Sequence, residues 1–472
     1  MSGTKEALTI HRKALEINLD PTIFGSFAEI GGGQEVARNF FQAGGASGTI
    51  AKTISAYDKT YSDAIYSKHE ISKRYVSRER LEQMLAFEYD ELLSFLDQSR
   101  KPGTRFFAFA NTVSTLNYKK DNISHGWLGL RFQLRENAEP NQVIIHVRLR
   151  ENDNLLQQNT LGVLGVNLIY ACFYLWERPN SFLQSLLDNL STDRVEITMV
   201  NMSGAELSYV DNRLLAVQLV KNDMTNAIMF DRFGEVQEPD DMLYKKNALV
   251  FRGSFRPVNY VSIDMLKTSF CLFKKDEDYD KHNTIPICEI TLNNLLSEGD
   301  FDEKDFLNRV DLLNEMGQNV MVSNFREFYK LVDFMTQFRV IKVRLVIGIQ
   351  TFSKVMNEKY YTHLKGGILE ALGQLFPHNV KIYIYPVLDE NSGELIRIRD
   401  LCVQPAVCHL LNHLIDNRLI LDVPNVNTKH LGINPTEIPD LIRHHADNWE
   451  TMVPVFIAKR IKERKLFGYS SD

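Results

Sequence analysis

The spacing of hydrophobic positions divides the chain into stretches of different predicted structure. Residues 5–100 are mainly helical in pattern, and over 73–98 leucines recur at helical spacing beside a mixed polar face. Residues 104–150 change to the alternation of β-strands, in three short runs separated by polar and turn residues. The largely apolar stretch 154–191 then predicts a buried helix.

From residue 194 onward, short apolar runs alternate with amphipathic stretches, which predicts alternating strands and helices. The expected strands are 195–202, 226–230, 247–254, 284–291, 319–323, 343–349 and 380–386. The expected helices are 211–222, 261–274, 303–316, 325–338, 351–375 and 405–417. Such alternation favours a largely parallel sheet covered by helices. We expect an α/β fold with a doubly wound sheet; a β/α barrel is the alternative, because the pattern leaves the strand number open.

These changes of pattern predict four regions. Residues 1–103 form a helical, glycine-rich N-terminal region, and residues 104–192 combine a small antiparallel sheet with a long helix. Residues 193–404 form the α/β domain, and residues 405–472 form a C-terminal helical region.

Composition and charge narrow the class of protein. The 472 residues are 44% hydrophobic and 24% charged, with a net charge of −6, which is globular and argues against general nucleic-acid binding. The five cysteines are scattered, and no two form a C-x-x-C pair, which indicates reduced thiols. No apolar run reaches the roughly 20 residues of a membrane span, and the N-terminus lacks a signal-peptide core. We therefore expect a cytoplasmic protein with no membrane span.

Residues 24–58 hold the densest glycine signal of the chain. Two clusters flank a short amphipathic segment: Gly31, Gly32, Gly33 and Gly44, Gly45, Gly48. Backbone amides in such loops can cradle an anion, most readily where a helix begins. The stretch contains no GxGxxG, and it departs from GxxxxGK[ST] because Ala51 precedes Lys52. Two tight turns between short helices are the alternative.

A second basic segment surrounds the predicted strand 247–254. Lys245, Arg252 and Arg256 stand close together there in an otherwise acidic chain. A guanidinium is a rigid fork that suits phosphate or carboxylate. The alternative is a set of ion pairs with nearby aspartates, for which Asp240, Asp241 and Asp264 are the candidates.

We predict that the glycine region and the basic segment meet in one anion site, because a phosphate is bound by several convergent donors and positive charge. The predicted contacts are Lys52, Thr53 and Ser55 on one side and Lys245, Arg252 and Arg256 on the other. Glu29 or Asp58 would hold a divalent cation that bridges to the phosphate, with Mg²⁺ as the expected ion.

Five stretches carry a resemblance to a known family: 13–58, with its FAEIGGGQEVARNFFQAGGASG core, 72–85, 210–220, 244–258 and 358–376. They resemble a family of uncharacterised bacterial cytoplasmic proteins. Its members are often named nicotinate or nicotinamide mononucleotide adenylyltransferases, and some are named TonB-dependent receptors. The resemblance covers nearly the whole chain and implies a bacterial, cytoplasmic protein connected with nucleotide chemistry. It transfers no catalytic residue, because the HxGH motif of true adenylyltransferases is absent: Trp127 follows His125-Gly126.

The leading hypothesis is an α/β protein that binds or acts on a phosphorylated or nucleotide-like small molecule, with nucleotidyl or phosphoryl transfer as the candidate reaction. The alternatives are a non-catalytic, self-assembling scaffold and a regulatory ligand sensor. We also expect a homo-oligomer, because aromatic residues gather beside the glycines: Phe40, Phe41, Tyr57, Tyr61 and Tyr66.

Overall fold

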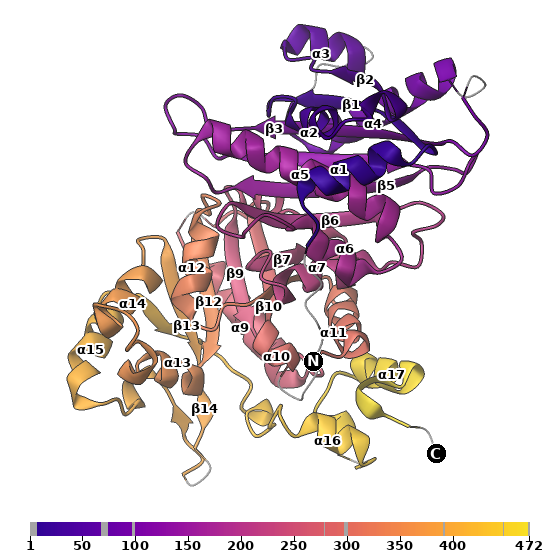
Figure 1. Ribbon diagram of the computed structural model, residues 1–472. Coiled ribbons are helices and arrows are strands. Elements are labelled where there is room, and N and C mark those ends of the chain that lie inside the picture. The colour runs from indigo at the N-terminus through magenta and orange to yellow at the C-terminus, as the bar shows by residue number, and fades with distance from the viewer. Residues whose placement is uncertain are drawn as a thin grey trace. The chain divides into compact units, whose positions relative to one another are not determined.

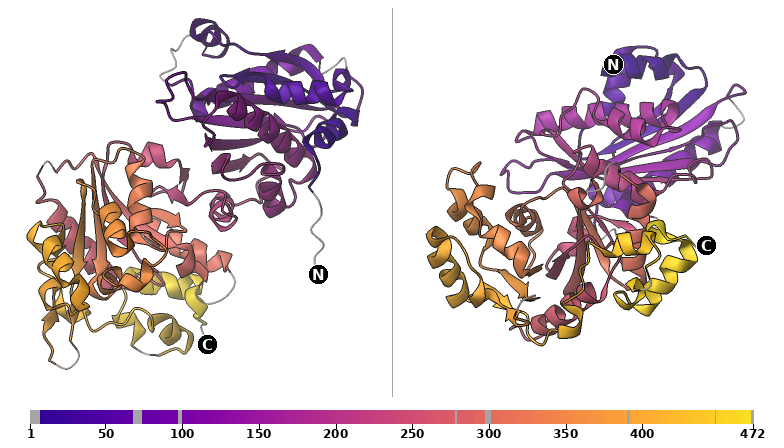
Figure 2. Two further views of the ribbon diagram at one scale, coloured as in Figure 1. Left: turned by 60° about the vertical axis from the view of Figure 1, so that its left-hand side comes forward. Right: turned by 90° about the horizontal axis from the view of Figure 1, so that it is seen from below.

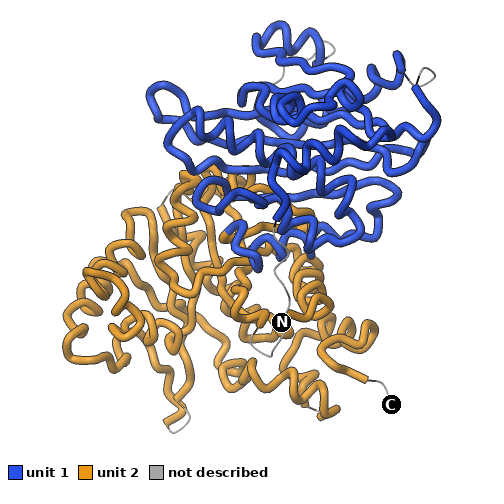
Figure 3. The backbone as a smooth tube through the Cα atoms, viewed as in Figure 1, with its two compact units in different colours: residues 1–225 blue, residues 226–472 orange. Residues whose placement is uncertain are grey.

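The computed structural model describes residues 7–67, 74–96, 100–277, 279–296, 301–389, 392–446 and 448–470. The chain forms two compact units, residues 1–225 (unit 1) and 226–472 (unit 2), which are coloured separately in Figure 3. Figure 1 labels their helices and strands. Each unit is built on its own open sheet, so each is described by itself.

Unit 1 contains a six-stranded sheet in the order β2-β1-β3-β4-β5-β6. The strands are β1 (Ile23–Ile30), β2 (Ile50–Ile54), β3 (Arg105–Ser114), β4 (His125–Phe132), β5 (Asn141–Leu149) and β6 (Val195–Ser203). Strand β1 runs parallel to both β2 and β3, and the pairs from β3 to β6 are antiparallel. The sheet is therefore mixed, with its parallel part at the β2 edge.

Helices cover both faces of this sheet. They are α1 (Ile10–Leu19), α2 (Glu35–Ala43), α3 (Lys59–Tyr66), α4 (Arg78–Leu96), α5 (Asn154–Tyr174), α6 (Pro179–Leu186) and α7 (Asn212–Lys221). Gly165 of α5 lies against Phe109 of β3, whereas Gly129 of β4 lies against Leu85 of α4. Because Phe109 pairs with Leu130, the neighbour of Gly129, α5 and α4 lie on opposite faces.

Unit 2 contains an eight-stranded sheet in the order β16-β13-β12-β9-β10-β11-β7-β8. The strands are β7 (Ala227–Phe230), β8 (Val236–Gln237), β9 (Asn247–Arg252), β10 (Thr284–Thr291), β11 (Asn319–Ser323), β12 (Lys342–Gly348), β13 (Val380–Tyr385) and β16 (Ile420–Asp422). All neighbours from β16 to β11 are parallel, and β7 and β8 are added in antiparallel pairs. A separate hairpin joins β14 (Val387–Leu388) to β15 (Leu395–Ile396).

Helices lie on both sides of the unit 2 strands (Figure 2). They are α8 (Pro239–Leu243), α9 (Tyr260–Phe273), α10 (Leu292–Leu296), α11 (Glu303–Glu315), α12 (Phe328–Thr336), α13 (Ile349–Val355), α14 (Gly367–Leu375), α15 (Cys408–Asp416), α16 (Ile438–Arg443) and α17 (Val455–Arg464). Leu331 of α12 and Leu372 of α14 share one core with Val250 and Leu345 of the sheet. Across the described ranges of both units, no helix combines the length and the apolar character needed to cross a membrane.

The order of the parallel strands creates a topological switch point in unit 2. Counted along the chain from β9, the strands stand in the order 3-2-1-4-5-6, which is the order of Rossmann folds. The chain leaves β11, returns across the sheet through α12 and adds β12 on the free side of β9. In unit 1, β1 is flanked in the same way by the two strands that follow it. In such sheets, ligands bind outside the carboxyl ends of the strands at the switch point.

The α/β class is confirmed, and the barrel alternative is wrong because both sheets are open. The expected largely parallel sheet is confirmed for the part of the unit 2 sheet that runs in the order β16-β13-β12-β9-β10-β11, while the sheet of unit 1 is mixed. The expectation of a helical region over 1–103 missed β1 and β2, which join β3 to β6 in one sheet. Almost every residue of β1 is buried, so the strand lacks the alternation by which a half-exposed strand is recognised.

Candidate functional site

The carboxyl edge of the unit 2 sheet gathers polar side chains from three neighbouring strands. Glu289 of β10 is fully buried, and its carboxylate accepts hydrogen bonds from Arg252 Nε at 2.8 Å and Arg252 Nη2 at 2.9 Å. Ser323 Oγ, at the end of β11, donates to the same carboxylate at 2.6 Å. The guanidinium also lies 4.1 Å from the centre of the Phe328 ring. The bidentate ion pair and the Ser323 hydrogen bond together link β9, β10 and β11 at their carboxyl ends.

A second ion-pair group lies beside the first. Arg256 Nε donates to Asp305 Oδ1 of α11 at 2.7 Å, and Arg309, one turn later on α11, pairs with the same carboxylate. Arg309 Nη1 also donates to the backbone oxygen of Ser254 at 3.2 Å. The loop after β9 is therefore fixed by guanidinium groups, and the edge carries three arginines against two carboxylates.

Arg252 and Arg256 lie in one region of the structure and both form ion pairs, while their predicted role in binding an anion stays a prediction. Their partners are Glu289 and Asp305, however, and not the aspartates nearer in sequence. Lys245 lies before β9, at the amino end of the strand. Because β9 has six residues, its ends are roughly 20 Å apart at about 3.3 Å per residue, so Lys245 and Arg252 do not face one small ligand.

The switch point itself has open space on the β12 side. Apart from Gly348 itself and its chain neighbours, no atom lies within 4 Å of the position that a Cβ would take on Gly348, the last residue of β12. Ser254 in the loop after β9 has an exposed side chain, as do Gln350 and Thr351 in the first turn of α13, which begins directly after β12. Space, backbone groups and neutral hydrogen-bonding side chains thus meet next to the arginine groups.

The N-terminus of α9, where a Rossmann fold receives a pyrophosphate, is already satisfied in this chain. The Tyr260 backbone N–H donates to the backbone oxygen of Met452 at 3.0 Å. The Ser262 N–H donates to Asn259 Oδ1 at 2.9 Å. Two amides of the first turn are thus already hydrogen-bonded within the chain. The space that a ligand could occupy therefore lies near Gly348 and not at the N-terminus of α9.

The second predicted group lies in unit 1. Lys52 and Thr53 belong to the edge strand β2, and Ser55 follows it with an exposed side chain. Lys52 Nζ is 2.7 Å from Glu88 Oε2 and also pairs with Glu91, and these carboxylates raise the pKa of Lys52 against the effect of burial. Lys52 therefore ties β2 to α4. That this group and the arginines of unit 2 bind one ligand stays a prediction.

The first glycine cluster forms the turn between β1 and α2. Gly31 has a φ of +91°, and a Cβ on it would stand 1.9 Å from the backbone oxygen of Val113, so this position requires glycine. Gly33 also has a positive φ, and Gly32 lies between them. The turn packs directly against the end of β3, so no space for a ligand remains at Gly31.

The second cluster, Gly44, Gly45 and Gly48, connects α2 to β2. The Gly48 N–H donates to the Gly45 oxygen at 3.0 Å, and Asn18 Nδ2 donates to the Gly44 oxygen at 2.7 Å. These glycines form a local turn anchored on α1, and the turn connects a helix to a strand and not two short helices.

Glu29 and Asp58 both act as helix caps. Glu29, at 1% exposure, accepts the N–H of Ala37 at 2.9 Å, that of Val36 at 3.2 Å and Asn111 Nδ2 at 3.2 Å. Burial raises its pKa to about 7, although these donors act in the opposite direction. Asp58 accepts the Tyr61 N–H at 2.8 Å at the start of α3. Within the described residues, no group of three or more His, Cys, Asp or Glu side chains is placed to hold a metal ion.

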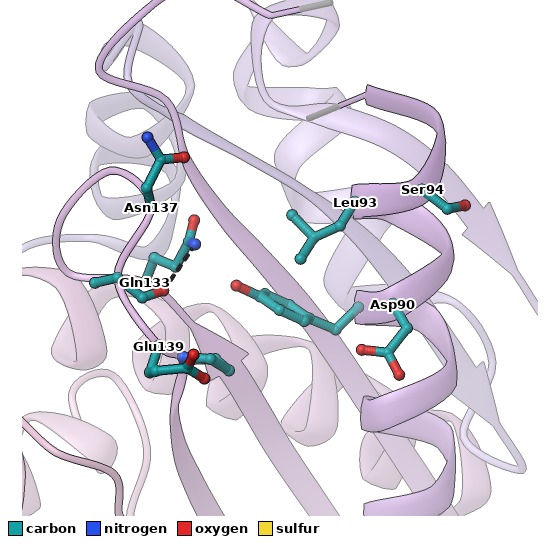
Figure 4. A pocket seen from close by; sticks show the side chains of 9 residues that line it. Asp90, Leu93, Ser94, Gln133, Asn137 and Glu139 are labelled. Carbon is teal, nitrogen blue, oxygen red and sulfur yellow. Dashed lines mark hydrogen bonds between the residues drawn. The ribbon is translucent and has the colours of Figure 1, made fainter. Parts of the chain in front are cut away.

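Unit 1 also contains a cavity of about 500 Å³ between α4 and the connection from β4 to β5 (Figure 4). Its lining residues are Tyr89, Asp90, Leu93, Ser94, Gln133, Asn137, Ala138, Glu139 and Pro140. Gln133 fixes the rim, because its Oε1 accepts the Phe106 N–H at 3.0 Å and its Nε2 donates to the Ala138 oxygen at 2.9 Å. Two carboxylates and several neutral polar groups suit a cationic or hydroxyl-rich compound better than a phosphate. Gln133 lies in the second of the three strand-like runs that the alternation over residues 104–150 predicts.

A cavity of about 670 Å³ lies at the opposite edge of the unit 2 sheet, near the C-terminal ends of α12 and α14. Arg339, Gln374 and His378 are among its lining residues. It faces the amino ends of β12 and β13, so it is separate from the switch point.

Comparison with known proteins adds little to this picture. No protein-family model and no curated protein matches the chain, so neither supports the adenylyltransferase name of the resembling family. The competence/damage-inducible protein CihA from Agrobacterium tumefaciens is 17% identical over 34% of this chain and 94% of that chain, with a TM-score of 0.24. A competence- or damage-inducible protein from Enterobacter asburiae is 12% identical over 34% and 95%, with a TM-score of 0.25. A CinA-superfamily protein from Escherichia coli is 14% identical over 38% and 91%, with a TM-score of 0.23. At TM-scores this low, the likenesses carry no inference about this chain.

Proposed function

We propose that unit 2 binds a phosphorylated or nucleotide-like small molecule at the carboxyl edge of its sheet, between the ends of β9 and β12, and that the reaction there is phosphoryl or nucleotidyl transfer. The observation that carries this proposal is the strand order, which places a topological switch point at these two strands. The charge at the edge supports the ligand class, because three guanidinium groups stand there against two carboxylates. Arginine is the side chain best suited to recognise phosphate through two parallel hydrogen bonds.

Gly348 offers a test that leaves the ion pairs intact. Its φ is −75°, and a Cβ placed there meets no atom within 4 Å beyond its chain neighbours. Gly348→Leu should therefore keep the fold while a bulky group fills the proposed ligand space. We expect the affinity for the nucleotide or phosphorylated compound that the wild type binds best to fall at least tenfold.

Gly373→Leu is the matched control. Gly373 also has open space around its Cβ position, but it lines the cavity at the amino edge. Calorimetry with ATP, ADP, nicotinamide mononucleotide and inorganic pyrophosphate, with and without Mg²⁺, provides the measurement. Absence of binding by the wild type, or equal losses in both variants, would contradict the proposal.

Self-association is the second candidate, and it would add to ligand binding or replace it. The edge position of β2 and the exposure of Tyr57 (74%) and Tyr61 (58%) just beyond it favour this candidate. Unpaired strand edges and exposed aromatic side chains are typical of contact surfaces. Replacing both tyrosines by serine should shift light scattering from a dimer to a monomer, and a monomeric wild type at micromolar concentration would exclude the candidate.

A further inference from the structure

Glu29 is a buried carboxylate without a positively charged partner. Its hydrogen-bond donors are the backbone amides of Val36 and Ala37 and the neutral side chain of Asn111. Within the described residues, no Lys, Arg or His side chain lies within ion-pair distance of it. A buried charge of this kind is costly, because neutral donors replace only part of the hydration that the carboxylate loses.

The groups around Glu29 add no compensating charge. On α2, Glu35 carries a like charge that acts against ionisation of Glu29, and Arg38 pairs with Glu35 at 3.2 Å. From β3, Asn111 is neutral and also accepts the Ile30 N–H at 3.1 Å. From α5, Gln158 approaches the glycine turn at Gly33 and is likewise neutral. The negative charge of Glu29 is therefore balanced only by dipoles.

We propose that Glu29 is a proton-linked latch on the glycine turn and the first turn of α2. When Glu29 holds its proton, the turn closes on the sheet without a buried charge. When Glu29 loses the proton, the closed state must bury the charge, whereas an opened turn would expose the carboxylate to water. Proton release therefore favours opening of residues 30–37, and proton uptake favours their closure.

The sign follows from the linkage between proton binding and opening. The pKa of Glu29 is about 7 in the closed state and 4.5 when the group is solvated. Between these values, a rise in pH removes protons mainly from the closed state, so the closed state loses its advantage. From pH 6 to pH 8 the closing equilibrium should weaken by about tenfold, which is the factor that a pKa near 7 gives over this interval.

Amide hydrogen exchange of the full-length protein tests the latch. After correction for the intrinsic rates, the protection of the Val36 and Ala37 amides should fall about tenfold from pH 6 to pH 8. Glu29→Gln should abolish this pH dependence, because glutamine does not titrate. The matched control is the amide of Leu156, which the exposed cap Asp153 holds at 3.0 Å at the start of α5, and its protection should not change.

Protection at Val36 and Ala37 that stays constant or rises with pH would overturn the proposal. A direct measurement covers the case in which Glu29→Gln does not fold. Carbon-13 NMR of the glutamate carboxyl groups in the wild type should find one group that titrates near neutral pH. If every glutamate titrates below about pH 5, the ordinary range for this side chain, the latch does not exist.

Discussion

Glu29 in unit 1 and Glu289 in unit 2 are buried carboxylates near the ends of parallel strands, at 1% and 0% exposure. Glu29 is held by two backbone amides and an asparagine, whereas Glu289 faces a guanidinium on two bonds and a serine hydroxyl. The same side chain therefore caps a helix in one unit and ties three strands together in the other. The difference shows that the partner of a buried carboxylate, and not its burial alone, decides whether the site depends on charge or on pH.

The largest expected effect is the loss of Arg252. Arg252→Ala leaves Glu289 buried without its cation, and removal of one partner from a buried ion pair costs about 3–5 kcal/mol of the free energy of unfolding. Denaturant unfolding would measure this loss. The exposed pair of Arg12 and Glu16 provides the control, because Arg12→Ala should cost less than about 1 kcal/mol. Equal costs in the two variants would mean that the pair at the β9 edge contributes no more than a surface contact.

The pH dependence of unfolding comes next in size. The folded pKa of Glu29 is raised from 4.5 to about 7, so its contribution to stability is greatest below pH 4.5 and declines as the pH rises through 7. The total decline is about 3 kcal/mol, at about 1.4 kcal/mol per pKa unit. The quantity to compare is the difference in unfolding free energy between wild type and Glu29→Gln from pH 4.5 to pH 8. If the difference in unfolding free energy between wild type and Glu29→Gln does not change with pH, Glu29 does not make stability depend on pH, and the proposed contrast with Glu289 is wrong.

The smallest expected loss of stability concerns a buried carboxylate of unit 1 that pairs with a lysine. Glu88 is fully buried and is bound by Lys52 and by the Tyr66 hydroxyl at 2.7 Å. Lys52→Met keeps most of the side-chain volume and removes the charge, so we expect a loss of about 1–3 kcal/mol, the cost of an unsatisfied buried polar group. Thermal unfolding at neutral pH would measure it, and an unchanged midpoint would show that the tyrosine alone is a sufficient partner for Glu88.

Much of unit 2 could be predicted from the sequence, because its strands are short apolar runs with polar ends. The expected strands at 284–291 and 319–323 coincide with β10 and β11. Unit 1 was harder, since β1 is buried on both faces and contains Gly25 and Ser26, which weaken a strand pattern. The edge strand β2 is short and polar, with Lys52 and Thr53 among its five residues.

The candidate site shows a similar division. The position of Arg252 and Arg256 at the end of a strand could be predicted from the local pattern. Their partners could not, because Glu289 and Asp305 reach them only through the order in which β9, β10 and α11 pack. Glu29 stands directly before a glycine turn and a helix, but its distant capping bonds to Val36 and Ala37 depend on the path of that turn.

The central position of β9 has a consequence for how unit 2 is synthesised. One neighbour, β10, is the next strand along the chain and begins at Thr284, whereas the other, β12, begins only at Lys342. A chain released or cleaved before Lys342 would present the β9 edge, with Leu249 and Val250, as an apolar strand without a partner. Free edges of this kind recruit strands from other molecules. Fragments of unit 2 that stop short of β12 should therefore aggregate, and a nascent chain would need shielding until β12 has emerged from the ribosome.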